Sequence, residues 1–270
     1  MKIVLDSNDL KNELKNDHNL GFVPTMGSIH KGHEYLILKS KKECSKTIVS
    51  IFINPAQFNS KKDLKNYPKN INKDLLILKK LKVDYVFTPK VKDIYSNKRN
   101  KKIKLNKTDL ILCANYRKEH FEGVLDVMDR LTKLIHPNKI FMGEKDYQQY
   151  YLVKKFLENR YKVKIIKCKT LRSINKVALS SRNLLLSRKD LTIAKKIFKE
   201  LIKLKKLISK KNAVNKYLAL KKGDLMERYQ IKIDYLENRN IKNLKETDNV
   251  MNSKIFIAYY LNEIRMIDNL

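Results

Sequence analysis

Short apolar runs compatible with β-strands alternate with amphipathic helical stretches along the first two thirds of this chain. The strand-like runs occupy residues 20–25, 47–53, 84–88, 139–142 and 162–168. Stretches with a helical spacing of apolar residues occupy 31–44, 71–81, 121–135 and 147–159. This alternation predicts a Rossmann-like α/β fold, a doubly wound parallel sheet with helices on both faces. Ligands of such sheets bind beyond the carboxyl ends of the strands.

The character of the sequence changes after Asn183. A lysine-rich helical region spans residues 187–217, and strand-like segments follow at 231–236, 255–261 and 264–267. We therefore expect a Rossmann-like catalytic domain over residues 1–182 and a smaller α+β lid domain over 183–270. The polar residues 96–109 indicate a loop within the first domain.

The sequence PTMGSIHKGH at residues 24–33 follows a strand-like run and opens a helix. His30 and His33 are three residues apart, so both imidazoles lie on one face of that helix. The free N–H groups and the dipole of a helix N-terminus favour an anion there, while Gly27 and Gly32 allow a ligand close to the backbone. The motif therefore predicts a phosphate-facing helix start. By itself it is equally compatible with two surface histidines on a loop.

Polar side chains also follow two other predicted strands. Asn54 and Gln57 come after residues 47–53, where their amides could bind a small polar ligand or cap a turn. Gly143, Lys145 and Asp146 come after residues 139–142. There the glycine permits a tight turn, the lysine offers a point charge to a phosphate, and the aspartate could cap the next helix.

A further cluster, Ser180, Ser181 and Arg182, combines two hydroxyls with a guanidinium. This combination can bind a phosphate, although it is also common loop chemistry. No spacing of His, Cys, Asp or Glu indicates a metal site, so a metal is expected only together with a nucleotide.

The net charge of +32 is compatible with nucleic-acid binding. However, fifty of the sixty basic residues are lysines, and they are scattered through every segment. The densest basic stretches, residues 98–107 and 195–211, contain one aromatic residue, Phe198, and so offer no series of rings that could stack on bases. We therefore expect solvated lysine faces rather than a nucleic-acid interface.

Localisation signals point to the cytoplasm. No apolar run approaches the ~18 residues that a membrane span needs. Residues 1–14 become charged after Leu5, unlike a signal peptide. The three cysteines, Cys44, Cys113 and Cys168, are widely spaced, which is typical of a reducing compartment.

The polar clusters, taken together in their order and content, resemble the pantothenate synthetase (pantoate–β-alanine ligase) family. The matching strings are PTMGSIHKGH, SIFINPAQF, NYPKN, HFEGV, FMGEKDYQQ, LSSRN and the C-terminal IRMIDN. The resemblance covers essentially the whole chain, and its HxGH signature is that of the wider nucleotidylyltransferase superfamily. Two alternatives are an adenylylating enzyme of that superfamily with a different acid, and a basic RNA-binding module. SIFINPAQF together with two glutamines argues against the first.

The resemblance implies which residues bind each substrate. The expected ATP-binding residues are Met26, Gly27, Ser28, Ile29, His30, Lys31, Gly32, His33, Gly143, Glu144, Lys145, Asp146, Leu171, Leu179, Ser180, Ser181 and Arg182. Those expected to act on the charge at the reacting phosphate are His30, His33, Lys145 and Arg182. The expected contacts to pantoate or β-alanine are Gln57, Gln149, Asn54 and Tyr67, and Asp74 matches a further pocket position.

The resemblance also implies the reaction. Pantoate would attack the α-phosphate of Mg-ATP to give pantoyl-adenylate, and β-alanine would then displace AMP to give pantothenate. The amine must lose a proton before it attacks, and His33 is a candidate acceptor. A homodimer is expected, with no membrane or nucleic-acid partner.

The chain departs from the family pattern at two places. Lys118-Glu119 stand where Pro-Gly is common, and Lys176 stands where glycine is usual. Both places lie beside expected site residues, but no assigned catalytic residue is lost. We therefore expect an active enzyme.

Overall fold

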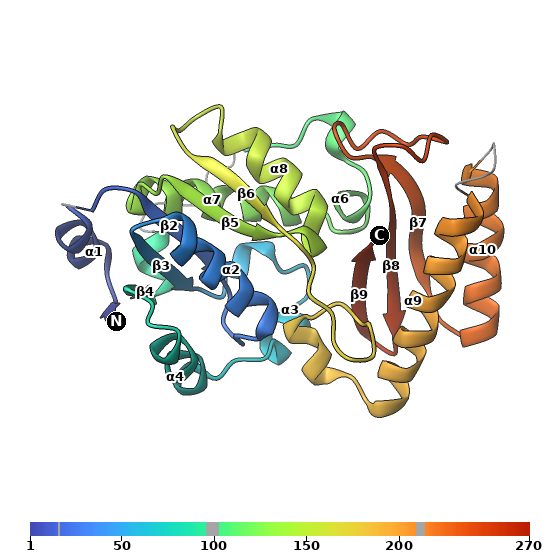
Figure 1. The fold of residues 1–270 in the computed structure, drawn as a ribbon, viewed down its shortest axis with the longest axis horizontal. Coiled ribbons are helices and arrows are strands. Elements are labelled where there is room, and N and C mark those ends of the chain that lie inside the picture. The colour runs from blue at the N-terminus through green and yellow to red at the C-terminus, as the bar shows by residue number, and fades with distance from the viewer. Residues whose placement is uncertain (16, 96–102, 209–213) are drawn as a thin grey trace. The chain divides into compact units, whose positions relative to one another are not determined.

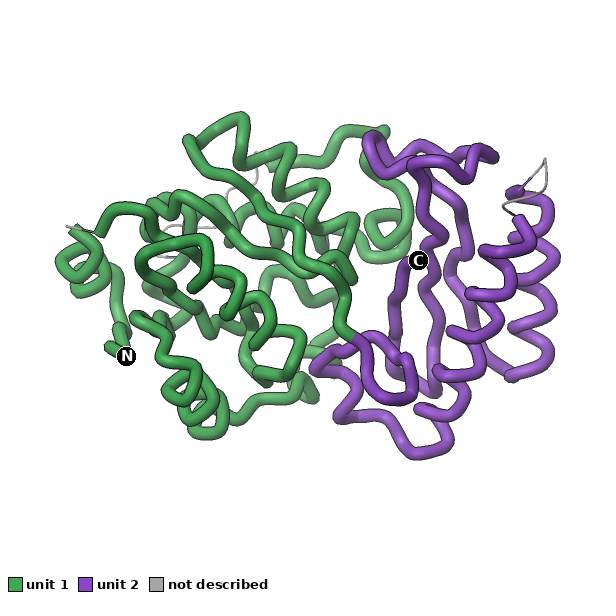
Figure 2. Tube along the Cα trace, in the orientation of Figure 1, with its two compact units in different colours: residues 1–171 green, residues 172–270 purple. Residues whose placement is uncertain are grey.

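The computed structural model describes residues 1–15, 17–95, 103–208 and 214–270. The chain divides into two compact units, Met1–Leu171 and Arg172–Leu270 (Figure 2). Half of the expected loop at residues 96–109 lies outside the described residues, and 103–109 include one short turn of 3₁₀-helix.

Unit 1 alternates strands and helices along the chain (Figure 1). Its strands are β1 (Lys2–Val4), β2 (Leu20–Thr25), β3 (Lys46–Ile51), β4 (Tyr85–Phe87), β5 (Lys139–Gly143) and β6 (Lys164–Cys168). Its α-helices are α1 (Ser7–Leu14), α2 (Lys31–Glu43), α3 (Lys61–Asn66), α4 (Ile71–Lys80), α5 (Val91–Ile94), α6 (Cys113–Tyr116), α7 (His120–Ile135) and α8 (Tyr147–Leu157). Short 3₁₀-helices are η1 (Pro55–Gln57), η2 (Lys107–Asp109) and η3 (Glu144–Asp146).

The six described strands of unit 1 form one parallel sheet in the order β1-β4-β3-β2-β5-β6. From β2 the chain winds through β3 toward one edge, and later through β5 and β6 toward the other. The winding direction therefore reverses between β2 and β5. In a doubly wound sheet this switch point opens the crevice in which ligands bind. The loops that follow β2 and β5 both begin there.

Both faces of this sheet are buried. Val23, Val49 and Phe141 lie in one apolar cluster with Leu36 and Ile37 of α2. Their strand neighbours Phe22, Ile48 and Ile140 are also fully buried and, because side chains alternate along a strand, they face the other side. There α7 packs against α1 and α8. The predicted parallel sheet with helices on both faces is confirmed.

The sequence patterns missed the first two elements. β1 has only three residues, of which two are exposed, so it carries no apolar run. α1 begins at a cap, because the Asp6 carboxylate accepts hydrogen bonds from the N–H groups of Asn8 and Asp9. An aspartate just before a helical segment is a recognised start signal, and it was the available clue.

Unit 2 is a small α+β unit, as predicted. It contains η4 (Ser181–Leu185), α9 (Arg188–Ile208), α10 (Val214–Tyr229), β7 (Ile233–Asn240), β8 (Ser253–Leu261) and β9 (Ile264–Asn269). The strands form an antiparallel sheet in the order β7-β8-β9. Apolar residues of both helices and all three strands share one core. The expected lysine-rich helical region over residues 187–217 contains α9 and the start of α10, and α10 continues beyond its expected end to Tyr229.

The boundary between the units lies before the expected division at Arg182–Asn183 because the intervening residues pack with unit 2. The Arg172 guanidinium forms a two-pronged ion pair with Asp268 on β9, at 2.6 and 2.8 Å. It also lies 4.1 Å from the centroid of the Phe198 ring on α9. Val177 is buried in the core of unit 2. The segment with Ser180, Ser181 and Arg182 therefore belongs to unit 2.

Candidate active site

The loop between β2 and α2 carries the HxGH motif in a shape that a buried aspartate holds. Gly27 has a φ of +80° and Ser28 a φ of +53°, both in the left-handed region. The Asp74 carboxylate on α4 accepts the N–H groups of Ser28 at 2.8 Å and Ile29 at 2.7 Å. Only 2% of Asp74 is exposed. Asp74 thus fixes the backbone of the loop, a role that the sequence did not indicate.

The side chains of His30 and His33 lie side by side, as expected. Their rings stack with centroids 4.0 Å apart and planes inclined by 23°. His30 is the N-cap of α2, and its Nδ1 accepts a hydrogen bond from the Gly32 N–H at 3.1 Å. The remaining proton of a neutral His30 ring is therefore on Nε2. The Nδ1 atom of His33 is buried and has no hydrogen-bond partner among the described residues.

Both imidazoles are held in the neutral form. Burial, followed by the charge of Lys145, lowers the pKa of His30 from 6.5 to about 4. Burial also lowers the pKa of His33 well below 6.5, with smaller contributions from His30 and Lys145. Lys145 follows β5, which pairs in parallel with β2, so the loops after these two strands begin side by side at the switch point. The site therefore combines two neutral rings with one ammonium group.

The lowered histidine pKa values predict a loss of stability in mild acid. Below pH 6.5 the unfolded chain binds a proton at His30 that the folded chain does not bind until about pH 4. Between pH 7 and pH 5 this contributes about 2 kcal/mol to the decrease in the free energy of unfolding. Urea unfolding of the unmodified chain and of His30→Asn at both pH values measures the difference, since asparagine keeps the helix cap. An equal pH dependence for both proteins would contradict the prediction.

The expected acid-binding amides lie on the loop that follows β3. The side-chain amide of Gln57 donates to the Met26 sulfur at 2.8 Å, which joins this loop to the HxGH segment. The Gln57 Oε1 atom accepts from Asn54 Nδ2 at 3.2 Å. Asn54 itself is 1% exposed, and all its hydrogen-bonding positions are used within the protein. We therefore revise the expected role of Asn54 from substrate contact to support for Gln57.

The N-terminal part of α7 packs against the loop that follows β3. A Cβ atom at Gly123 would lie 2.7 Å from the Ala56 carbonyl carbon and 3.1 Å from the Gln57 nitrogen, so the close approach requires glycine. The Gln57 carbonyl accepts from His120 Nδ1 at 2.7 Å and from the Arg117 guanidinium at 3.2 Å. Residues 120–124, the HFEGV string, therefore form the part of α7 against which η1 packs.

Residues after β5 differ from the expectations in two details. Gly143 is extended, with φ −74° and ψ 133°, so it does not form the expected tight turn. A Cβ atom there would meet nothing within 4 Å, which leaves space for a ligand. Asp146 occupies the N-cap position of α8, but its carboxylate pairs with Lys145 Nζ at 3.2 Å and accepts no capping bond.

The two glutamines at the start of α8 have different surroundings. Gln148 is buried, donates to the Ile111 carbonyl at 2.7 Å and accepts from the Cys113 N–H at 3.0 Å. Gln149 is half-buried and has no side-chain hydrogen bond within the described residues. Tyr67 is buried, and its ring makes an edge contact with Phe58. Of these residues, Gln149 has the amide that is available to a substrate.

The remaining expected nucleotide contacts lie at and beyond the end of unit 1. Leu171 is the last residue of unit 1, whereas Leu179, Ser180, Ser181 and Arg182 belong to unit 2. There Ser180 is the N-cap of η4, and its hydroxyl accepts from the Arg182 N–H at 3.3 Å. Their contact with ATP stays a prediction.

The departures from the family pattern occur at left-handed backbone positions. Glu119, the N-cap of α7, has a φ of +58°, and Lys176 has a φ of +65°. Glycine adopts this conformation freely, whereas for other L-residues it costs about 1 kcal/mol. The backbone thus keeps the glycine-type shape although the side chains have changed.

Comparison with known proteins identifies the family. The sequence profile described as pantoate-beta-alanine ligase matches residues 2–270. The chain belongs to the pantoate–β-alanine ligase family. Among family members, the pantothenate synthetase of Leptospira biflexa serovar Patoc is 38% identical over 279 residues, which cover 100% of this chain and 98% of that protein. The pantothenate synthetase of Ruthia magnifica is also 38% identical, over 276 residues, with the same coverage.

Solved structures of pantoate–β-alanine ligases share the fold. The pantothenate synthetase of Thermus thermophilus superposes with a TM-score of 0.93 at 28% identity and covers 100% of this chain and 99% of its own. The ligase of Francisella tularensis, solved with β,γ-ATP and β-alanine, gives a TM-score of 0.86 at 34% identity, with coverage of 100% and 97%. The resemblance inferred from the motifs is confirmed.

The described part of this pantoate–β-alanine ligase contains neither a cluster of metal-ligating side chains nor a membrane-spanning helix. No group of three or more His, Cys, Asp or Glu side chains in residues 1–15, 17–95, 103–208 and 214–270 could hold a metal ion. None of the helices in the same residues is long and apolar enough to cross a membrane.

Proposed function

We propose that this pantoate–β-alanine ligase condenses (R)-pantoate with β-alanine, consuming ATP and releasing AMP and diphosphate through a pantoyl-adenylate. Family membership over the whole chain supports the reaction. The structural observation that carries it is the pair of neutral, stacked histidines at the N-terminus of α2, next to Lys145 at the switch point.

In the first step the pantoate carboxylate attacks the α-phosphorus of ATP, and the bond to diphosphate breaks. The nucleophile is already ionised, so the site must position the reactants and offset negative charge rather than remove a proton. His30 Nε2–H can donate to a phosphate oxygen because its Nδ1 is occupied by the helix cap. Lys145 supplies positive charge, and the N–H groups at the start of α2 add to it.

The open space beside Gly143 and the polar side chains after β5 support the binding of a nucleotide next to His30 and Lys145. Glycine at position 143 leaves room beside β5, since a Cβ atom there would have no described residue within 4 Å other than its chain neighbours. We propose that Ser180, Ser181 and Arg182 bind phosphates of the nucleotide, because two hydroxyls and a guanidinium suit that ligand. Mg²⁺ is expected to enter bound to the phosphates of ATP.

Pantoate is proposed to lie between the amides of Gln57 and Gln149. Gln57 is oriented by Asn54 and Met26, while Gln149 has no competing side-chain hydrogen bond in the described residues. In the second step the β-alanine amine attacks the pantoyl carbonyl and AMP leaves. The relative from Francisella tularensis was solved with β-alanine, which supports this substrate.

The histidine pKa values change the expected proton chemistry. A ring with a pKa well below 6.5 binds a proton weakly, so His33 in the ligand-free protein is a poor acceptor for the amine proton. Bound ATP would raise both histidine pKa values through its negative charge. We therefore assign His30 and His33 to hydrogen bonding at the α-phosphate. A cytoplasmic location and a homodimer remain predictions.

Product analysis with ATP, pantoate and β-alanine tests the function. Pantothenate and AMP should appear in equal amounts only when all three substrates are present, and ADP should not form. Replacing pantoate by other hydroxy acids tests the alternative of a different acid substrate. The proposal would be contradicted if the protein formed AMP with another hydroxy acid and β-alanine but formed no pantothenate from pantoate.

A further inference from the structure

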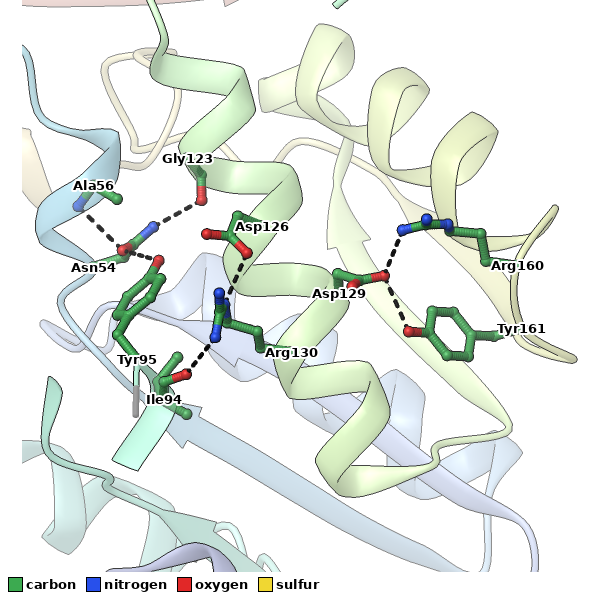
Figure 3. Close-up of polar contacts among 10 residues, drawn as sticks. All are labelled: Asn54, Ala56, Ile94, Tyr95, Gly123, Asp126, Asp129, Arg130, Arg160 and Tyr161. Carbon is green, nitrogen blue, oxygen red and sulfur yellow. Dashed lines mark hydrogen bonds and ion pairs between the residues drawn. The ribbon is translucent and has the colours of Figure 1, made fainter. Parts of the chain in front are cut away.

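Four hydrogen bonds hold the Asn54 side chain. Three of them join it to its own loop and to α7, and the fourth comes from Tyr95. Its Nδ2 atom donates to Gln57 Oε1 at 3.2 Å and to the Gly123 carbonyl at 3.0 Å. Its Oδ1 atom accepts from the Ala56 N–H at 3.2 Å and from the Tyr95 hydroxyl at 2.8 Å (Figure 3). Tyr95 directly follows α5, 41 residues further along the chain.

The position of Tyr95 is itself set by an ion pair on α7, in which Arg130 is half-buried and Asp126 is buried. The Arg130 guanidinium lies 4.9 Å from the centroid of the Tyr95 ring and donates to the Ile94 carbonyl at 3.1 Å. Its Nε atom also donates to Asp126 at 2.8 Å, and Asp126 is 1% exposed (Figure 3). An arginine stacked on an aromatic ring and paired with a buried carboxylate has little freedom to move.

We propose that Tyr95, held by Arg130, is a positioning residue for pantoate binding and acts through Asn54 on Gln57. The chain of contacts runs from Asp126 through Arg130 and Tyr95 to Asn54, whose amide orients the Gln57 carboxamide. The inference rests on the proposed function, in which Gln57 binds pantoate. Tyr95 need not touch any substrate.

The hydrogen-bond chemistry explains why one hydroxyl matters. The two donors at Asn54 Oδ1 fix which end of the amide is oxygen, and so direct Nδ2 toward Gln57. Without the Tyr95 hydroxyl, a buried acceptor loses one partner and the Asn54 amide is held on that side by Ala56 alone. The Gln57 carboxamide then rotates more freely, and pantoate must order it on binding.

The test compares Tyr95→Phe with Tyr161→Phe. Tyr161 is the matched control because its hydroxyl also donates to a side chain on α7, Asp129, at 3.0 Å, away from the Asn54 loop (Figure 3). Loss of one buried hydrogen bond predicts an increase of about tenfold in the KM for pantoate of Tyr95→Phe. The KM for ATP should stay within about twofold, and Tyr161→Phe should match the unmodified protein in both constants.

A second variant tests the support of the ring. Arg130→Met removes the charge and the donors that hold Tyr95, and it should also raise the KM for pantoate while leaving the KM for ATP unchanged. An equal KM for pantoate in Tyr95→Phe and Tyr161→Phe would overturn the inference, as would a parallel rise in the KM for ATP. Failure of the unmodified protein to form pantothenate would instead overturn the proposed function, and the inference with it.

Discussion

A His33→Ala protein is expected to form pantoyl-adenylate at least about a hundredfold more slowly than the unmodified chain, which is the usual cost of removing one preorganised donor at a reacting centre. His33 lies in the first turn of α2, and its ring stacks on that of His30 with centroids 4.0 Å apart. Alanine removes a hydrogen-bonding ring and also the surface that holds the His30 ring in place. Diphosphate release from ATP and pantoate, without β-alanine, measures this step alone.

The control for this variant is His18→Ala, because His18 is an exposed histidine that precedes β2, whereas the motif follows the other end of that strand. It should leave diphosphate release unchanged. Near-normal adenylate formation by His33→Ala, with normal thermal unfolding, would remove His33 from the proposed mechanism. A loss confined to the β-alanine step would instead return His33 to a role in proton transfer.

Replacing Asp74 by alanine is expected to weaken ATP binding and stability together. The two N–H groups of Ser28 and Ile29 would lose their acceptor, and an unpaired buried group costs about 1–3 kcal/mol. The left-handed conformations of Gly27 and Ser28 would no longer be held, so the loop would not present the start of α2 correctly. We expect the free energy of unfolding to fall by about 2–4 kcal/mol and the KM for ATP to rise at least about tenfold.

The isosteric Asp74→Asn variant provides the graded comparison. Asparagine keeps one acceptor oxygen but turns an NH₂ group toward the second N–H donor, so an intermediate effect is expected in both measurements. Urea unfolding and steady-state kinetics with varied ATP give the two values. If Asp74→Ala raised the KM for pantoate and not that for ATP, the carboxylate would support a different part of the site.

The sequence predicted most of the sheet because its strands are buried on both faces and read as apolar runs. β2 and α2 have nearly the predicted limits, and the HxGH motif sits where the winding of the sheet reverses. β1 escaped detection because three residues at a sheet edge carry no periodic signal. The division of this region between α9 and α10 was not predicted, because both helices carry the same lysine-rich helical spacing.

Long-range side-chain contacts could not be predicted from one sequence. Asp74 reaches the HxGH loop from 45 residues away, and Tyr95 reaches Asn54 from 41 residues away. Local patterns encode helices and strands, but such contacts depend on how those elements pack. For the same reason, Asn54 looked like a substrate contact until its four partners were known. The positive φ at Glu119 and Lys176, by contrast, was foreshadowed by their place at positions where the family favours glycine.

The close approach of Gly123 to η1 limits how the acid specificity of this enzyme can be redesigned. Not even a methyl group fits between Gly123 of α7 and the Ala56 backbone. Substitutions at Gly123 therefore cannot be used to shift η1 and reposition Gln57. In the proposed pantoate site, a larger hydroxy acid would therefore have to be accommodated beside Gln149, whose side chain has no hydrogen bond to break in the described residues. Directed evolution toward bulkier acids should therefore gather its first useful changes on α8.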